Sequence, residues 1–130
     1  MPISWASKLQ KTTALSSYKA EYMAIKEAIK EYLYLINIFK QLEIKELLKL
    51  NNQEFYLFID NKPAIDLANN PEHHSKTKHI DIQYHFVREK IRKGTINLDY
   101  ISIKNQLADI FTKALNNHSF QGLFSKLNIK

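Results

Sequence analysis

The sequence predicts an α/β fold, in which strands and helices alternate along the chain. The chain has 130 residues, which is about the length of one domain. It contains only two glycines and three prolines, so few turns and long regular elements are expected. Segments with strand periodicity and helix periodicity follow one another in the order strand, helix, strand, helix, helix, strand, helix. We therefore expect a layered sheet covered by helices.

The N-terminal part of the chain predicts a strand followed by a long amphipathic helix. Apolar and polar residues alternate over residues 3–9, which is the pattern of a half-buried strand. From Tyr18 to Phe39 apolar residues recur every three or four positions, as on one side of a helix that ends near residues 40–42. The opposite side of this helix carries Lys26, Glu27, Lys30 and Glu31.

The middle of the chain predicts a central strand and two helices. Residues 55–59 are apolar on both alternating faces, which is typical of a strand covered on both sides. Pro63 suits the first turn of a short helix over residues 63–68. An apolar stripe from Ile80 to Ile91 predicts a further helix, and Gly94 is a usual signal for its end.

The C-terminal part predicts one more strand and two helices. Residues 96–101 have strand character, and residues 102–105 form a loop. Apolar residues from Leu107 to Leu115 predict a helix that ends at Asn116. Residues 120–127 predict a short final helix.

Three acidic residues are candidates for a functional site, and each has a structural alternative. Asp60 directly follows the predicted central strand, at the edge where α/β sheets build sites, but an Asp there is also typical of a turn or helix cap. Glu21 has no cationic helical neighbour, although a solvated helix residue would look the same. Asp109 lies four residues before Lys113, so a local ion pair is its alternative.

Together, these three acids would suit a divalent cation. Mg²⁺ takes oxygen ligands, and two such ions can activate a water and stabilise the leaving oxygen of a phosphodiester. The chain has no cysteine, which excludes disulfides, thiolate zinc sites and cysteine nucleophiles. Residue types alone do not establish the geometry of a metal site.

The charge of the chain favours a polyanionic partner. The net charge is +6, as is common for proteins that bind nucleic acid. Six of the 19 cationic residues fall between Lys76 and Lys93, and helical spacing puts Arg88 and Arg92 on one face. The alternative is a solvated helix face. No apolar run is long enough to predict a membrane span.

Seven short sequence motifs occur in the order of a known pattern. They are Ile3-Ser4-Trp5-Ala6-Ser7-Lys8, Ala14-Leu15-Ser16-Ser17, Ala20-Glu21-Tyr22, Asp60-Asn61, Thr77-Lys78-His79-Ile80-Asp81, Tyr84-His85-Phe86-Val87-Arg88-Glu89 and Gln106-Leu107-Ala108-Asp109-Ile110-Phe111-Thr112-Lys113. With these motifs the chain resembles the ribonuclease H region of a copia-type retrotransposon Pol polyprotein, from about residue 3 to residue 127.

The resemblance implies a ribonuclease H-like fold and two-metal cleavage of RNA in RNA–DNA hybrids, with Mg²⁺ or Mn²⁺ as cofactor. The family uses four acids, and Glu21, Asp60 and Asp109 match three of them. Likeness and charge together suggest a set of nucleic-acid contacts. These are Lys76, Thr77, Lys78, His79, Arg88, Arg92 and Lys104.

The resemblance also has a gap. The fourth acid of the family lies upstream of the segment that matches Ile3, and residues 1–20 contain no acid. We therefore expect residues 1–130 to be a single, N-terminally truncated domain without the first two strands of the five-stranded sheet. Such a domain should be inactive alone, so its status as an enzyme stays open, and its partner would be the upstream reverse transcriptase segment.

Two alternatives and a location complete the expectations. The chain would otherwise be a non-catalytic remnant that binds nucleic acid, or a small structural or interaction protein that keeps the fold. The composition fits a cytoplasmic or nuclear protein, and the resemblance implies a virus-like particle for the parent element.

Overall fold

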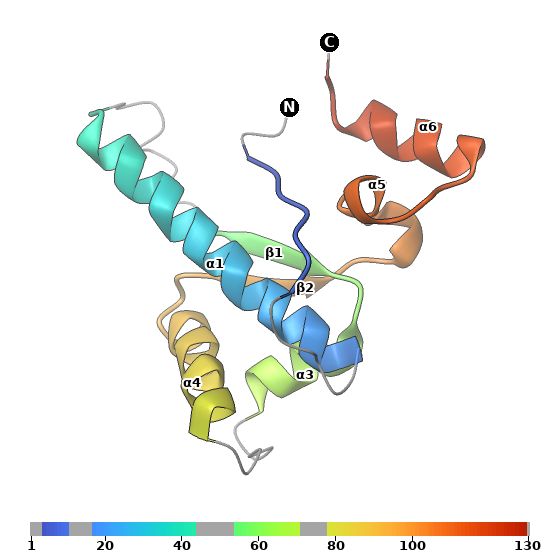
Figure 1. The fold of residues 1–130 in the computed structure, drawn as a ribbon. Helices are drawn as coiled ribbons and strands as arrows, with labels where there is room; N and C mark the ends of the chain where they lie inside the picture. The colour runs from blue at the N-terminus through green and yellow to red at the C-terminus, as the bar shows by residue number, and fades with distance from the viewer. Residues whose placement is uncertain (1–3, 11–16, 44–53, 71–77, 130) are drawn as a thin grey trace. The chain divides into compact units, whose positions relative to one another are not determined.

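The computed structural model describes residues 4–10, 17–43, 54–70 and 78–129. The described residues form a mixed α/β structure with one two-stranded parallel sheet, in agreement with the predicted α/β class (Figure 1). The elements in chain order are α1 (Ser17–Gln41), β1 (Tyr56–Ile59), α3 (Lys62–Asn69), α4 (Lys78–Arg92), β2 (Asn97–Tyr100), the 3-10 helix η2 (Ile103–Asn105), α5 (Asp109–Thr112) and α6 (Asn117–Lys126).

The chain divides into two compact units, which are described separately. Residues 14–100 form the helix–sheet unit, and residues 1–13 together with residues 101–130 form the terminal unit. No helix in the described ranges is both long enough and apolar enough to cross a membrane.

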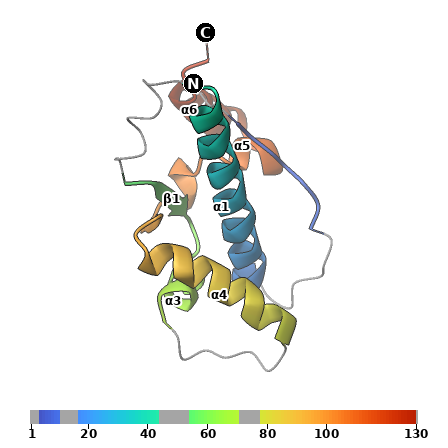
Figure 2. The ribbon, with the colours of Figure 1, turned by 90° about the vertical axis from the view of Figure 1, so that its left-hand side faces the viewer.

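Helix α1 provides one side of the core of the helix–sheet unit. Its apolar stripe buries Tyr22, Ile25 and Ile29, as the periodicity of the sequence predicts. Helices α3 and α4 pack against it, and Figure 2 shows α4 crossing α1 at a steep angle. The predicted long helix is confirmed, and α3 and α4 cover the buried part of its apolar stripe.

Strands β1 and β2 pair in parallel, with Leu57 opposite Leu98 and Ile59 opposite Tyr100. Helices α3 and α4 form the crossover between them, as parallel pairing requires. The expected coverage of residues 55–59 on both sides is wrong for this pair. Tyr56 is 47% exposed and Phe58 is 50% exposed, whereas the alternate residues pack into the core. In the described part of the chain, the helices of this unit therefore cover one face of the sheet.

Helices α3 and α4 begin and end at recognisable signals. Asn61 caps α3, because its side-chain oxygen accepts a hydrogen bond from the backbone N–H of Ala64 at 3.1 Å, and Pro63 occupies the first turn. Gly94 follows α4 with a positive φ of 66°, a conformation that glycine adopts without strain. Both predicted helices are confirmed.

The core of this unit contains one buried hydroxyl group. Tyr22 donates a hydrogen bond to the backbone carbonyl of Tyr84 at 3.2 Å, and the two rings meet edge to face at 4.4 Å. Burial raises the pKa of Tyr22 well above its usual range. The contact therefore fastens α1 to α4 with both apolar area and a hydrogen bond.

The terminal unit departs from the predicted elements. Residues 4–10 are not a strand, and no strand lies among the described residues of this unit to pair with them. An isolated strand would leave its backbone N–H and C=O groups without partners, so the alternating pattern alone is not sufficient.

The C-terminal helices also differ from the prediction in their boundaries. Helix α5 spans only Asp109–Thr112, because the backbone is already extended at Lys113. Asn116 does not end a helix but begins one: its side chain accepts a hydrogen bond from the N–H of Ser119 at 2.8 Å and caps α6. Helix α6 then buries Leu123.

Candidate functional site

Asp60 lies at the carboxyl end of β1, directly after the buried Ile59, and is half-buried. Because β1 and β2 are parallel, their carboxyl ends meet at the same edge of the sheet. The ammonium of Lys62 lies over the Tyr100 ring, 4.7 Å from its centroid, and so links the two strand ends. This edge therefore combines an acid, a cation and a phenol.

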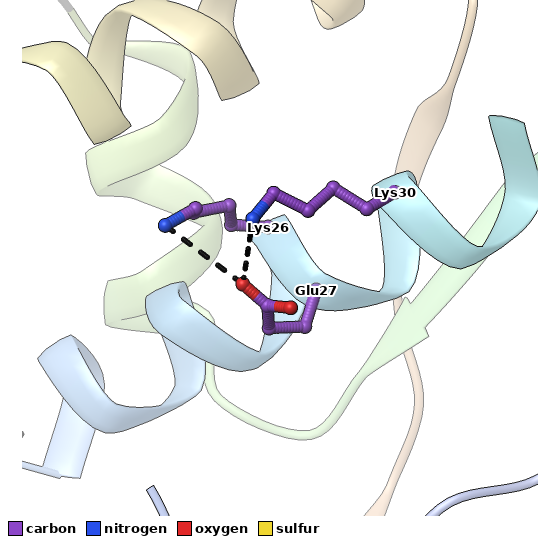
Figure 3. A network of polar contacts seen from close by, with 3 residues as sticks. All are labelled: Lys26, Glu27 and Lys30. Atoms are coloured by element: carbon purple, nitrogen blue, oxygen red, sulfur yellow. Dashed lines mark hydrogen bonds and ion pairs between the residues drawn. The ribbon is translucent and has the colours of Figure 1, made fainter. Parts of the chain in front are cut away.

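Glu21 lies on α1, directly before the buried Tyr22, and is half-buried in the same unit as Asp60. The charged residues of the next turn are engaged with one another. Lys26 and Lys30 both point toward Glu27, at 3.8 and 3.1 Å (Figure 3). Lys26 and Lys30 therefore share the carboxylate of Glu27.

Asp109 lies in the terminal unit, at the first position of α5. It is buried, and its carboxylate lies 2.7 Å from the ammonium of Lys113, four residues along. The ion pair that the spacing suggests is thus formed. The structure groups Glu21 with Asp60 in one unit and places Asp109 in the other.

Whether these acids could hold a metal ion depends on how many of them lie close together. No group of three or more His, Asp or Glu side chains in the described ranges could hold a metal ion. Glu21 and Asp60 supply two carboxylates, which is fewer than the six oxygen ligands that Mg²⁺ takes, although waters fill part of this shell. Binding of Mg²⁺ or Mn²⁺ therefore stays a prediction.

The predicted nucleic-acid contacts lie in different parts of the chain. Lys78 and His79 lie in the first turn of α4, whereas residues 76 and 77 lie outside the described residues. Arg92 is exposed at the end of α4, and Lys104 is exposed in η2. These exposed cations remain available to a polyanion.

Arg88 differs from the other cations because the protein itself uses its guanidinium. One guanidinium nitrogen donates hydrogen bonds to the carbonyls of Leu67 at 3.1 Å and Asn70 at 2.7 Å, at the end of α3. The same group lies 5.7 Å from the centroid of the Tyr84 ring. The helical spacing from Arg92 did not reveal these partners, because they lie 18 and 21 residues away in sequence.

Sequence reasoning also missed Trp5 and Lys126 as surface groups of interest. Trp5 was assigned to a half-buried strand but is 67% exposed. Lys126 Nζ donates a hydrogen bond to the side chain of Asn105 at 2.8 Å, and so joins the end of α6 to η2. A separate count of charges for residues 1–13 and 101–130 would have drawn attention to the terminal unit.

The chain is similar over most of its length to parts of retrotransposon polyproteins. It is 38% identical over 119 residues to the Retrovirus-related Pol polyprotein from transposon TNT 1-94 of Nicotiana tabacum, which covers 92% of this chain. It is 35% and 34% identical over 128 residues to the Retrovirus-related Pol polyproteins from transposons RE1 and RE2 of Arabidopsis thaliana, which cover 98% of it.

The comparisons confirm the relation to retrotransposon Pol polyproteins. The chain spans about 8% of the length of each of these relatives. No protein-family model matches the chain, and no solved structure does.

Proposed function

We propose that the chain is the ribonuclease H segment of a copia-type reverse transcriptase, with an incomplete ribonuclease H-like fold. In the parent polyprotein it would take part in cleaving the RNA strand of RNA–DNA hybrids. The observation that carries the proposal is the 34–38% identity to retrotransposon Pol polyproteins over nearly the whole chain. The α/β architecture with its parallel β1–β2 pair supports it.

Three acids have a role in this proposal. Asp60 lies at the carboxyl edge of the sheet, where α/β proteins bind their ligands. Glu21 belongs to the same unit, and Asp109 is buried with Lys113 as its counter-ion. With a fourth acid, they would hold Mg²⁺ or Mn²⁺, which supplies an activated water and stabilises the leaving oxygen when bound.

The hybrid would be held by cations and polar groups on two segments. Lys78, His79 and Arg92 would contact phosphates from α4, and Lys104 from η2. Lys76 and Thr77, which lie outside the described residues, belong to the same proposed set. Arg88 is left out of this set, because its guanidinium already binds the end of α3. A cytoplasmic or nuclear location is part of the proposal.

A second function is favoured by the charge of the chain. The chain would then bind nucleic acid without cleaving it, consistent with its net charge of +6. The two functions differ in whether cleavage appears once the acid set is completed.

The test measures cleavage of a labelled RNA–DNA hybrid with Mg²⁺ or Mn²⁺. We expect none from the 130-residue chain, since the family resemblance implies a set of four acids and only Glu21, Asp60 and Asp109 match it. Fusing the stretch that precedes the matched region in the tobacco relative should produce cleavage. Asp60→Asn should abolish that cleavage, whereas Asp66→Asn, which changes an exposed acid on α3, should not.

The possible results separate the two functions. A fusion that binds the hybrid but never cleaves it would favour the non-catalytic function. Cleavage by the 130-residue chain itself, abolished by Asp60→Asn, would overturn the expectation of inactivity. A fusion that neither binds nor cleaves would overturn both functions.

A further inference from the structure

Almost all of the net charge of the chain belongs to the terminal unit. Its two segments, residues 1–13 and 101–130, contain six lysines and one acid, which gives +5 of the total +6. The lysines are Lys8, Lys11, Lys104, Lys113, Lys126 and Lys130. The helix–sheet unit holds the remaining 13 cations and 12 acids. The smaller unit therefore carries the charge that would attract a polyanion.

Local ion pairs strengthen this contrast. In the helix–sheet unit Lys26 and Lys30 share Glu27 (Figure 3), and Lys93 pairs with Glu89. In the terminal unit the one acid is buried and lies against Lys113. No other carboxylate side chain of this unit can therefore neutralise its remaining lysines.

The fold of the terminal unit brings two of these lysines to one place. Lys104 lies in η2, next to Asn105. Asn105 accepts the hydrogen bond of Lys126 at 2.8 Å, across 21 residues of sequence. Both lysines are exposed, so their charges can act together on a neighbouring phosphate backbone.

The same unit displays an ordered aromatic surface. One face of the Trp5 ring stacks on Phe111, with the centroids 5.1 Å apart and the planes 12° from parallel. Trp5 is nevertheless 67% exposed, which is unusual for an indole that serves only as core. The stack fixes the orientation of the ring and leaves apolar area open to solvent.

Charge and aromatic surface together have the composition of a single-strand binding site. Such sites combine a basic groove that follows the backbone with aromatic side chains on which bases stack. In a duplex or a hybrid the faces of the bases are already stacked on one another, so a protein ring reaches them mainly in single strands.

We propose that the terminal unit binds single-stranded nucleic acid, with Lys104 and Lys126 at the phosphates and a base stacked on Trp5. The inference rests on the nucleic-acid partner of the proposed function but not on cleavage. It assigns this unit a substrate class, the unpaired strand, that differs from the hybrid.

The experiment uses the 130-residue chain in EDTA, so that metal-dependent chemistry does not enter. Trp5 is the single tryptophan, and its fluorescence therefore reports directly on stacking. We would titrate the chain with oligothymidine, with an RNA–DNA hybrid of the same length and with inorganic polyphosphate. Oligothymidine should quench Trp5 and bind more tightly than the hybrid, whereas polyphosphate should bind without quenching.

Variants then separate stacking from charge. Trp5→Leu should weaken the binding of a labelled oligothymidine about 5- to 150-fold by fluorescence anisotropy, and Trp5→Phe should restore part of the loss. Lys104→Gln and Lys126→Gln should each reduce the slope of log K against log salt by about 0.7. Lys40→Gln, an exposed lysine on α1, is the matched control and should leave the slope unchanged.

Four results would overturn the inference. They are unchanged Trp5 fluorescence on saturated binding, no detectable binding of oligothymidine, tighter binding of the hybrid, and an equal effect of Lys40→Gln on the salt slope. Circular dichroism of each variant shows whether the fold is retained. Hybrid cleavage by the fusion without single-strand binding would overturn this inference alone, and the reverse result would overturn only the catalytic proposal.

Discussion

Replacing Arg88 by methionine tests whether this residue stabilises the fold or binds nucleic acid. Its guanidinium donates two hydrogen bonds to carbonyls at the end of α3, where the last carbonyls of a helix lack partners within the helix. A cation at this position also interacts favourably with the helix dipole. Methionine keeps an apolar stem and removes both effects.

The expected magnitude follows from the surroundings of each bond. The bond to Leu67 is partly buried, so the loss of its donor leaves a partly shielded carbonyl unsatisfied, at about 1–3 kcal/mol. Asn70 is exposed, and water replaces most of its bond. The buried Nε of Arg88 has no hydrogen-bond partner among the described residues, and its removal offsets part of the loss. We expect Arg88→Met to lower the free energy of unfolding by about 2 kcal/mol.

The assay is thermal and urea unfolding followed by circular dichroism. For a unit of this size, about 2 kcal/mol corresponds to a decrease in Tm of roughly 8–16 °C. Arg92→Met removes the same charge from the exposed end of α4 and should change stability by less than about 0.5 kcal/mol. Two results together would show that Arg88 is a nucleic-acid contact and that the structural argument is wrong. They are the same Tm for Arg88→Met and Arg92→Met, and a loss of affinity for the hybrid in Arg88→Met alone.

Three further predictions concern the buried hydroxyl, a cap and the core. Tyr22→Phe should cost about 1 kcal/mol at neutral pH through the lost bond to Tyr84. The folded state raises the pKa of Tyr22, so the contribution of its hydroxyl to stability is fully present below about pH 10 and decreases above it. The difference in free energy of unfolding between wild type and Tyr22→Phe, measured with denaturant, should therefore become smaller above about pH 10. A difference that does not change with pH would contradict this. Asn116→Ala should lower stability by about 1 kcal/mol and increase amide exchange in α6, whereas equal effects from Asn117→Ala would argue against the cap. Ile29→Ala should cost about 2–5 kcal/mol and Ile29→Val about 0.5–1.5 kcal/mol in urea unfolding, because Ile29 is fully buried; similar midpoints for both would refute the assigned core.

The boundaries of the C-terminal helices show the limit of local signals. Asn116 is a plausible end for one helix and an equally plausible start for the next. The structure uses it as the cap of α6, because the backbone has already left the helical conformation at Lys113. An Asn that can either end one helix or cap the next is assigned only from the backbone conformation on both sides of it.

The sheet shows a different limit. The continuous apolar run of residues 55–59 predicted a strand correctly, and β1 occupies Tyr56–Ile59. The same run predicted wrongly that both faces of the strand are covered. Apolar side chains favour burial, but they do not determine whether helices pack on one face of the sheet or on both. Tyr56 and Phe58 remain about half exposed because α1, α3 and α4 pack on the other face.

By itself, the sequence determined what depends on neighbours along the chain. The pattern of apolar residues specified α1, α4 and both strands, and Pro63 specified α3. The order of seven motifs indicated the relation to retrotransposon polyproteins. The pair of Asp109 and Lys113 was also visible, because four residues make one helical turn.

Tertiary structure alone decided which distant groups meet. It placed Arg88 at the end of α3, Trp5 on Phe111 and Lys126 beside η2. Each of these contacts joins residues about 20 or more positions apart, so no local period encodes it. Such contacts form where buried carbonyls need donors and rings need apolar partners, and those needs arise only when the chain is packed.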